Sequence, residues 1–290
     1  MEAATPVPGD SDLRHWIGRT ETRTDVVTPT PIAALAATLD DTRPPPLPGD
    51  AVPPLWHWLY FLPLSPLAEA GPDGHPARGG FLPPVPLPRR MWAGSRIDFH
   101  RPLKVGESMS RVSTIADVST KEGRAGPLVF VVVRHTIADA TGPVINEEHD
   151  IVYRENPRPG SAGAPGVPPA NGEALWSRSI VPTPVLLFRY SALTFNSHRI
   201  HYDQPYATQA EGYPGLVVHG PLIATLLLDL LARNLPQASV VRFMFRAVSP
   251  LFDRAPFTVC GRPAADARSV RLWARNAHAG LAMDAEATLG

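Results

Sequence analysis

The chain has 290 residues, equal numbers of acidic and basic side chains, and an isoelectric point near 7.2. Because it has no basic excess, it lacks the electrostatic field that attracts nucleic acid or an anionic membrane surface, and we expect neither as a partner. Its length and its 44% hydrophobic content suit two domains with ordinary cores, and a single cysteine, Cys260, excludes an intramolecular disulfide framework and a cysteine zinc cluster.

The N-terminal part, residues 1–155, is expected to form the first domain. The chain begins without the basic-then-apolar order of a signal peptide, and no segment approaches the roughly 18 apolar residues of a membrane span, so a cytoplasmic location is expected. Thr30 can cap a helix that begins at Pro31. Alternating apolar residues then predict four strands, at Met91 to Phe99, Ser108 to Val118, Leu128 to Ile137 and Val144 to Tyr153.

A proline-rich excursion separates that helix from the first of these strands. The stretch from Pro44 to Pro88 carries too many prolines for a helix or a central strand. Its interior, Leu55 to Leu62, reads LWHWLYFL and has ample apolar area to offset the entropy lost on ordering. We therefore expect this interior segment to be buried against the domains, where it could line or cover a pocket.

A second proline-rich stretch, residues 156–184, contains few large apolar residues and is expected to be a surface linker. The second domain is expected to span residues 185–290. Its pattern predicts a helix from Pro221 to Leu235, followed by strands at Val240 to Ala247, Phe257 to Arg262, Ser269 to Arg275 and Leu281 to Leu289. The two halves thus look like diverged copies of one plan, a helix followed by antiparallel strands.

The stretch from Phe188 to Leu222 carries the most informative polar residues. Asn196 precedes His201 by five positions, and a His219-Gly220 turn precedes the second-domain helix. An imidazole suits proton transfer because its ordinary pKa of about 6.5 lies close to working pH. Backbone N–H groups at a helix start are unpaired donors at the positive end of the helix dipole, so they can bind a developing oxyanion.

This stretch, FRYSALTFNSHRIHYDQPYATQAEGYPGLVVHGPL, resembles the active-site segment of the MaoC-like (R)-specific enoyl-CoA hydratases. The Tyr206-Ala207 pair and the His219-Gly220 turn fall where that family places them. The position of the family's catalytic Asp holds Asn196 in this chain. The resemblance implies an α+β fold, a tandem (double) hot-dog in which each half is an antiparallel sheet wrapped around a central helix.

The resemblance also implies roles for individual residues. His201 is the candidate acid and base, and the Gly220 amide is the candidate oxyanion donor. A carboxamide does not titrate in the useful range, so Asn196 can only orient water or a carbonyl oxygen. The candidates for substrate contact are His198, Arg199, Arg189, Tyr190 and His219, of which His219 is expected mainly to brace the turn before the helix.

Further motifs narrow the resemblance to a subgroup. The stretches MWAGSRIDFHRPLKVGES and KEGRAGPLVFVVV, together with the second half, resemble the mesaconyl-C4-CoA (3-methylfumaryl-CoA) hydratases and the mitochondrial-type 3-hydroxyacyl-thioester dehydratases. In that group the aspartate is typically replaced, so Asn196 fits the subgroup. The N-terminal half has no counterpart of Asn196 and His201, which implies a degenerate partner domain and one active site per chain, at the junction of the halves.

The implied function is that of a hydro-lyase that reversibly hydrates a 2-enoyl thioester, without a metal or redox cofactor. A mesaconyl-C4-CoA hydratase is the leading interpretation, an acyl-CoA or acyl-ACP thioester is the expected partner, and a homodimer is the candidate assembly. A 3-hydroxyacyl-ACP or -CoA dehydratase of lipid or polyketide synthesis, a non-catalytic acyl-thioester-binding protein and a thioesterase remain alternatives. A second carboxylate on the acyl group would need a cationic partner, for which His198, Arg199 and Arg189 are candidates.

Overall fold

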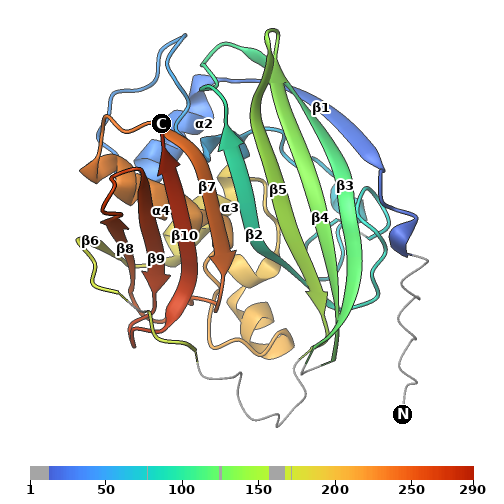
Figure 1. The fold of residues 1–290 in the computed structure, drawn as a ribbon. Coiled ribbons are helices and arrows are strands. Elements are labelled where there is room, and N and C mark those ends of the chain that lie inside the picture. The colour runs from blue at the N-terminus through green and yellow to red at the C-terminus, as the bar shows by residue number, and fades with distance from the viewer. Residues whose placement is uncertain (1–12, 77, 124–125, 157–166, 171) are drawn as a thin grey trace, which may run out of the picture.

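The computed structural model describes residues 13–76, 78–123, 126–156, 167–170 and 172–290. Its strands form one antiparallel ten-stranded sheet in the order β1-β3-β4-β5-β2-β7-β10-β9-β8-β6 (Figure 1). The helices that position the candidate site are α2 (Pro29–Thr38), α3 (Pro184–Leu193) and α4 (Gly220–Asn234). The strands are β1 (Thr20–Val26), β2 (Arg89–Phe99), β3 (Ser108–Gly123), β4 (Gly126–Asp139), β5 (Gly142–Arg154), β6 (Trp176–Ile180), β7 (Val240–Ala247), β8 (Phe257–Pro263), β9 (Ser269–Arg275) and β10 (Leu281–Leu289).

The sheet consists of two halves with the same internal strand order. One half is β1-β3-β4-β5-β2 and the other is β6-β8-β9-β10-β7, so each strand of the first has a counterpart in the second. The halves join edge to edge where β2 pairs with β7, with Gly94 opposite Arg246 and Asp98 opposite Arg242. This is the repeated plan expected from the sequence. The strands predicted from alternating apolar residues are all present, within a few residues of the expected bounds.

Strands β1 and β6 were not predicted, and both are edge strands. β1 reads TETRTDV and alternates only between exposed and half-buried residues, while β6 reads WSRSI and buries only Ile180. An edge strand covers little of the core, so its apolar alternation is weak. β6 lies inside residues 156–184, the stretch predicted as a linker. The rest of that stretch is largely exposed where it is described, and residues 157–166 and 171 lie outside the described part.

Helix α4 lies against the inner face of the C-terminal half of the sheet (Figure 1). Every residue from Leu222 to Leu231 is buried, because the sequence LIATLLLDLL offers apolar or small side chains on all sides of the helix. The charged exception, Asp229, forms ion pairs with Arg178 at 2.5 Å and Arg233 at 2.8 Å. None of the described helices is long and apolar enough to cross a membrane.

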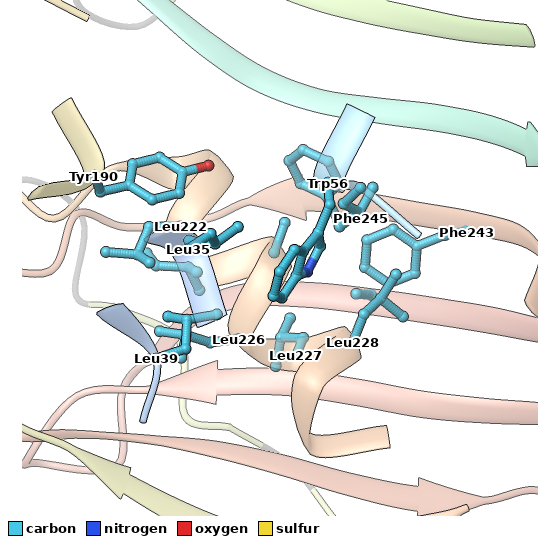
Figure 2. Packing of buried hydrophobic residues seen from close by; sticks show 14 of the residues in the cluster. Leu35, Leu39, Trp56, Tyr190, Leu222, Leu226, Leu227, Leu228, Phe243 and Phe245 are labelled. Carbon is cyan, nitrogen blue, oxygen red and sulfur yellow. The ribbon is translucent and has the colours of Figure 1, made fainter. Parts of the chain in front are cut away.

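The aromatic segment Leu55–Leu62 is buried, as predicted from its composition. Trp56 is only 4% exposed and lies among the α4 leucines and the β7 phenylalanines Phe243 and Phe245 (Figure 2). Trp58 packs edge-on against Phe245, with ring centroids 6.3 Å apart. The segment therefore fills interior space at the junction of the two halves.

A buried carboxylate anchors this segment to the N-terminal half. Glu147 of β5 is 2% exposed and accepts a hydrogen bond from the indole N–H of Trp58 at 3.1 Å. Its second oxygen pairs with Nε2 of His57 at 3.0 Å, and His149 lies 2.6 Å from the first. Burial opposes ionisation, but the neighbouring imidazoles lower the pKa of Glu147 well below its usual range.

The two halves differ in their helices. Helix α4 packs against the strands of the C-terminal half, whereas helix α2 packs mainly against α3 rather than against the strands of the N-terminal half.

Candidate active site

The turn after α3 sets the position of Asn196. Helix α3 ends at Leu193, and Phe195 then adopts a left-handed backbone with φ of +50°. Asn196 donates its backbone N–H to the Ser191 carbonyl at 2.8 Å, and its Oδ1 accepts from the N–H of His198 at 3.0 Å. An Asn side chain that bonds the backbone two residues ahead is typical of a turn. Its Nδ2 has no acceptor among the described residues and remains available to a ligand.

His201 is presented as a neutral imidazole with one nitrogen free. It is 8% exposed, and its Nδ1 donates to the Val217 carbonyl at 2.7 Å. The N–H of Val217 donates back to the Ile200 carbonyl at 2.9 Å, which fixes the two segments together. Burial lowers the pKa of His201 to about 4, although the bond to Val217 opposes this shift. At neutral pH, Nε2 therefore carries a lone pair, and it has no hydrogen-bond partner among the described residues.

His219 supports His201 from behind. The two rings stack with centroids 3.7 Å apart and an interplanar angle of 17°. His219 is fully buried, and its Nε2 lies 2.8 Å from Oγ of Ser191. Burial and the proximity of His201 lower the pKa of His219 well below its usual range. His219 thus packs flat against His201 as a neutral neighbour and fixes the plane of its ring.

Gly220 opens α4 at the same place. His219 precedes it as the N-cap residue with an extended backbone, so the first N–H groups of the helix have no partner inside it. The Gly220 N–H has no acceptor elsewhere in the described part of the chain. A Cβ added to Gly220 would meet no atom within 4 Å, which indicates open space beside the residue. A ligand oxygen can therefore approach the positive end of this helix.

The other residues predicted from the sequence to contact substrate lie in different surroundings. His198 lies close to His201, with ring centroids 5.5 Å apart and perpendicular planes. Arg199 is already held, because it pairs with Asp203 at 2.8 Å and donates to the carbonyl of Pro72. Arg189 is exposed on α3. Tyr190 is buried beside His219, and burial raises its pKa. Of these candidates, the structure gathers His198 and His219 around His201.

Sequence reasoning missed a loop of the proline-rich excursion, Gly71–Pro76, that docks on this turn. Ser197 Oγ donates to the Gly74 carbonyl at 2.5 Å, and the Arg199 N–H donates to the Asp73 carbonyl at 2.9 Å. Gly74 has φ of +88°, and a Cβ there would lie 2.0 Å from the Ser197 carbonyl oxygen, so only glycine fits. The loop places the His75 ring 4.1 Å from that of His198.

Within the described part of the chain, docking of this loop brings together a group of side chains that could hold a metal ion. Ligand atoms of Asp73, His75 and His198 all lie within 4.8 Å of one another. The Asp73 carboxylate is occupied by His75, whose Nδ1 lies 3.2 Å from Oδ2 and whose backbone N–H donates to Oδ1 at 3.0 Å. The PDGH turn gave no sequence signal for this proximity, since the loop and His198 are more than a hundred residues apart.

Comparison with known proteins supplies relatives for the whole chain. Residues 55–253 match the family described as hydroxyacyl-thioester dehydratase type 2. The chain is 49% identical to the mesaconyl-C(4)-CoA hydratase of Chloroflexus aurantiacus, over 97% of this chain and 99% of that protein. It is 32% identical to the mitochondrial hydroxyacyl-thioester dehydratase type 2 of Schizosaccharomyces pombe, over 71% and 76% of the two chains.

A solved structure supports the fold. A Mycobacterium tuberculosis protein described as a double hot-dog fold matches with a TM-score of 0.55 and 16% identity, and the match covers 100% of both chains. Two sheet halves of the same strand order, joined edge to edge, are what such a fold requires. The chain is thus an α+β double hot-dog, as the sequence predicted.

Proposed function

The chain belongs to the hydroxyacyl-thioester dehydratase type 2 family and is a hydro-lyase, and from this premise we propose that it reversibly hydrates mesaconyl-C4-CoA. The proposed catalytic residues are His201, Asn196 and Gly220. The choice of substrate is supported by near half identity to a relative of that name along almost its full length. We further propose that residues 1–155 and 185–290 act as two domains with one active site per chain, and that residues 156–184 connect them and supply the edge strand β6 to the second.

The observation that carries the proposal is the state of His201. Its Nδ1 proton is committed to the Val217 carbonyl at 2.7 Å, so Nε2 is an acceptor, and a pKa lowered to about 4 keeps it so at neutral pH. A general base has to be unprotonated and within reach of the water whose proton it takes. A buried imidazole that faced only protein would be a structural residue, whereas Nε2 of His201 has no partner among the described residues.

The proposed reaction neither consumes nor releases a proton overall, because the proton taken from water is returned to the substrate. As the oxygen of water bonds to the β-carbon, Nε2 of His201 takes a water proton and the electrons of the double bond move to the thioester oxygen. The Gly220 N–H, at the positive end of α4, stabilises that oxyanion. The enolate then collapses, and its α-carbon takes the proton back from His201. Asn196 orients the water through Nδ2, because its Oδ1 is engaged by His198.

The filled interior at the junction of the two halves supports a short acyl group. A long acyl chain needs an apolar tunnel, and the space at the junction of the halves is occupied by Trp56 (Figure 2). Trp58 packs against the same cluster. This favours a short acyl group, such as that of mesaconyl-C4-CoA, over the lipid-type 3-hydroxyacyl thioesters that remain the main alternative. A non-catalytic binder is disfavoured because it would not need a free, neutral imidazole beside a free helix N-terminus.

The proposal is tested by direct turnover measurements. The purified protein is mixed with mesaconyl-C4-CoA, crotonyl-CoA and a long-chain 2-enoyl-CoA, and loss of the conjugated thioester absorbance is followed. We expect the highest kcat/KM for mesaconyl-C4-CoA and the lowest for the long chain. A preference for the long chain would support the dehydratase alternative, and no turnover of any of the three would support the binder.

A variant of Gly220 tests the proposed oxyanion site without disturbing the fold. Gly220→Val adds a side chain into space where no atom lies within 4 Å, at a negative φ, so the fold should tolerate it. The same side chain should obstruct the thioester oxygen and lower kcat by about 10²-fold or more, the usual cost of losing an oxyanion donor. Thermal melting serves as the control. Full activity in a folded Gly220→Val protein would remove Gly220 from the mechanism.

A further inference from the structure

The substrate proposed above carries a second carboxylate, on the carbon that water attacks, and this carboxylate needs a partner near His201. Of the candidates named from the sequence, Arg199 is occupied by Asp203 and Arg189 is exposed on α3. His198 remains, with its ring 5.5 Å from that of His201. The residues around His198 therefore decide how such a carboxylate could be held.

Arg90 of β2 contributes an uncompensated positive charge at this place. It is half-buried and lies opposite Tyr153 of β5. Arg90 forms a hydrogen bond with the Tyr153 hydroxyl. It has no carboxylate partner among the described residues. Several other partly buried arginines do have one: Arg89 pairs with Glu211, Arg96 with Asp150 and Arg178 with Asp229. The half-buried Arg154 and Arg275 also lack a carboxylate partner among the described residues, but of these three arginines Arg90 is the one whose charge acts on both His75 and His198. A cation removed from water without a counter-ion is costly, so its retention suggests that a ligand supplies the missing charge.

Two imidazoles lie in the field of Arg90. Burial and the charge of Arg90 both lower the pKa of His75, against the effect of Asp73. Burial, His75 and His201 lower the pKa of His198 to about 2, and Arg90 adds to this shift. The charge of Arg90 thus disfavours a further positive charge on either ring and favours an anion beside them. The docked Gly71–Pro76 loop fixes His75 in this position, with its ring 4.1 Å from that of His198.

We infer that Arg90, His75 and His198 form a receptor for the second carboxylate of the acyl group, and so set the preference for a dicarboxylic substrate. The inference rests on the proposed hydration of mesaconyl-C4-CoA. In this arrangement the thioester oxygen lies at Gly220, the attacked carbon beside His201, and the carboxylate one bond further, toward His198. Arg90 supplies the charge, the neutral ring of His198 supplies a hydrogen bond, and His75, held by Asp73 at 3.2 Å, fixes the position of that ring.

The same cluster could instead bind a cation through Asp73, His75 and His198. Charge argues against this, because Arg90 and Arg78 both act on His75 as positive neighbours. Arg78 is held there by the carbonyls of Val85 and Leu87. Asp73 would also have to give up its bonds to His75. An anion fits the surrounding charge, and a metal ion is retained as an outcome of the test.

The test compares two substrates that differ in the carboxylate. Wild type, Arg90→Met and Arg90→Lys are assayed with mesaconyl-C4-CoA and with crotonyl-CoA, which lacks the second carboxylate. Arg246→Met is the matched control, because Arg246 is an exposed arginine on the neighbouring strand β7. For Arg90→Met we expect kcat/KM to fall about 10- to 100-fold on mesaconyl-C4-CoA, mainly through KM, as for a lost hydrogen bond to a charged group.

On crotonyl-CoA the Arg90→Met variant should keep its rate or gain, since no partner of Arg90 is lost. Arg90→Lys should recover part of the loss, and His75→Gln should raise KM on mesaconyl-C4-CoA alone. Equal losses on both substrates, or no loss on either, would overturn the receptor. Metal dependence, seen as loss of activity with EDTA and recovery with Zn²⁺, would overturn it as well. If wild type itself prefers crotonyl-CoA, the proposed substrate and the receptor both fail, while hydratase activity stands.

Discussion

At the scale of single residues, the proposed use of one imidazole without a partner carboxylate rests on the stacked pair of His201 and His219. With ring centroids 3.7 Å apart, the two rings cannot both be charged, and both pKa values are lowered. His219 is committed to Ser191, whereas Nε2 of His201 is left free. A low pKa makes His201 a modest base but, once protonated, a strong acid toward the enolate carbon.

Substitutions at His201 and Asn196 test this division of labour. His201→Ala should lower kcat by roughly 10²–10⁴-fold, the usual size of general acid–base catalysis. Asn196→Ala should cost less, and Asn196→Asp should stay folded and active, because a carboxylate oxygen can also accept from the His198 N–H. Turnover of mesaconyl-C4-CoA and crotonyl-CoA measures all three variants. Near-normal rates for both alanine variants would mean that the motif plays no catalytic part.

The pH dependence of kcat/KM tests the state of His201 in the free enzyme. The base form is required and its pKa is about 4, so activity is complete above that pH and is lost only as the pH falls through it. We expect a flat profile between about pH 6 and 8, with Asn196→Asp adding a second titrating group. A fall in the kcat/KM of wild type with an apparent pKa near 6.5, the ordinary value for histidine, would contradict the lowered pKa.

At the scale of elements, the Gly71–Pro76 loop connects the proline-rich excursion to the turn between Asn196 and His201. Its contacts are mostly to backbone atoms, through the Ser197 hydroxyl and the Arg199 N–H, and they depend on an approach that leaves no room for a Cβ at Gly74. The loop therefore orders residues Ser197 to Arg199, between Asn196 and His201, from the opposite half of the molecule.

Two glycine variants separate docking of this loop from backbone strain. Gly74 and Gly49 have nearly equal φ values, +88° and +89°, but a Cβ at Gly49 would meet nothing within 4 Å. Both alanine variants should lose about 1 kcal/mol through positive φ, and Gly74→Ala should lose more because its Cβ meets the Ser197 carbonyl; urea unfolding measures both. Only Gly74→Ala should also lower kcat/KM, by about 10-fold or more, since the Ser197 carbonyl has to move. Equal activity in the two variants would show that docking does not influence the site.

At the scale of the whole molecule, one continuous sheet holds the two halves in a fixed relation. The pairing of β2 with β7 joins the halves edge to edge (Figure 1). Glu147 of the N-terminal half holds the aromatic segment through the indole N–H of Trp58. The interior that results contains many titratable groups out of water. Stability and pH are therefore coupled throughout the molecule.

Acid should unfold this protein readily. The folded pKa is lowered for five histidines, His75, His135, His198, His201 and His219, in each case with burial as the main cause. The unfolded chain binds protons near pH 6.5 and the folded one does not, so this contribution is complete above 6.5 and is lost as pH falls below it. Between about pH 7.5 and 5.5, urea unfolding should show a loss on the order of 1 kcal/mol for each such group. A free energy of unfolding that stays constant or rises toward acid would contradict these shifts.

The sequence by itself determined what depends on local pattern. Helix α4 and the predicted strands follow from the spacing of apolar residues, and the burial of Leu55–Leu62 follows from its composition. The motif from Asn196 to Gly220 could be found because its members lie within one turn-and-helix segment. The edge strands β1 and β6 could not, since they bury little and leave weak patterns.

Only the tertiary structure decided which distant groups meet. Ser197 and Gly74 are 123 positions apart, and Glu147 lies 90 positions from His57, yet each pair is joined by a hydrogen bond. No periodicity encodes such contacts, because they depend on how the two sheet halves pack and on where a proline-rich loop returns. Arg90 likewise reads as an ordinary strand arginine in the sequence. It becomes an uncompensated charge near the site only because folding gives it a tyrosine, and no carboxylate, among the described residues.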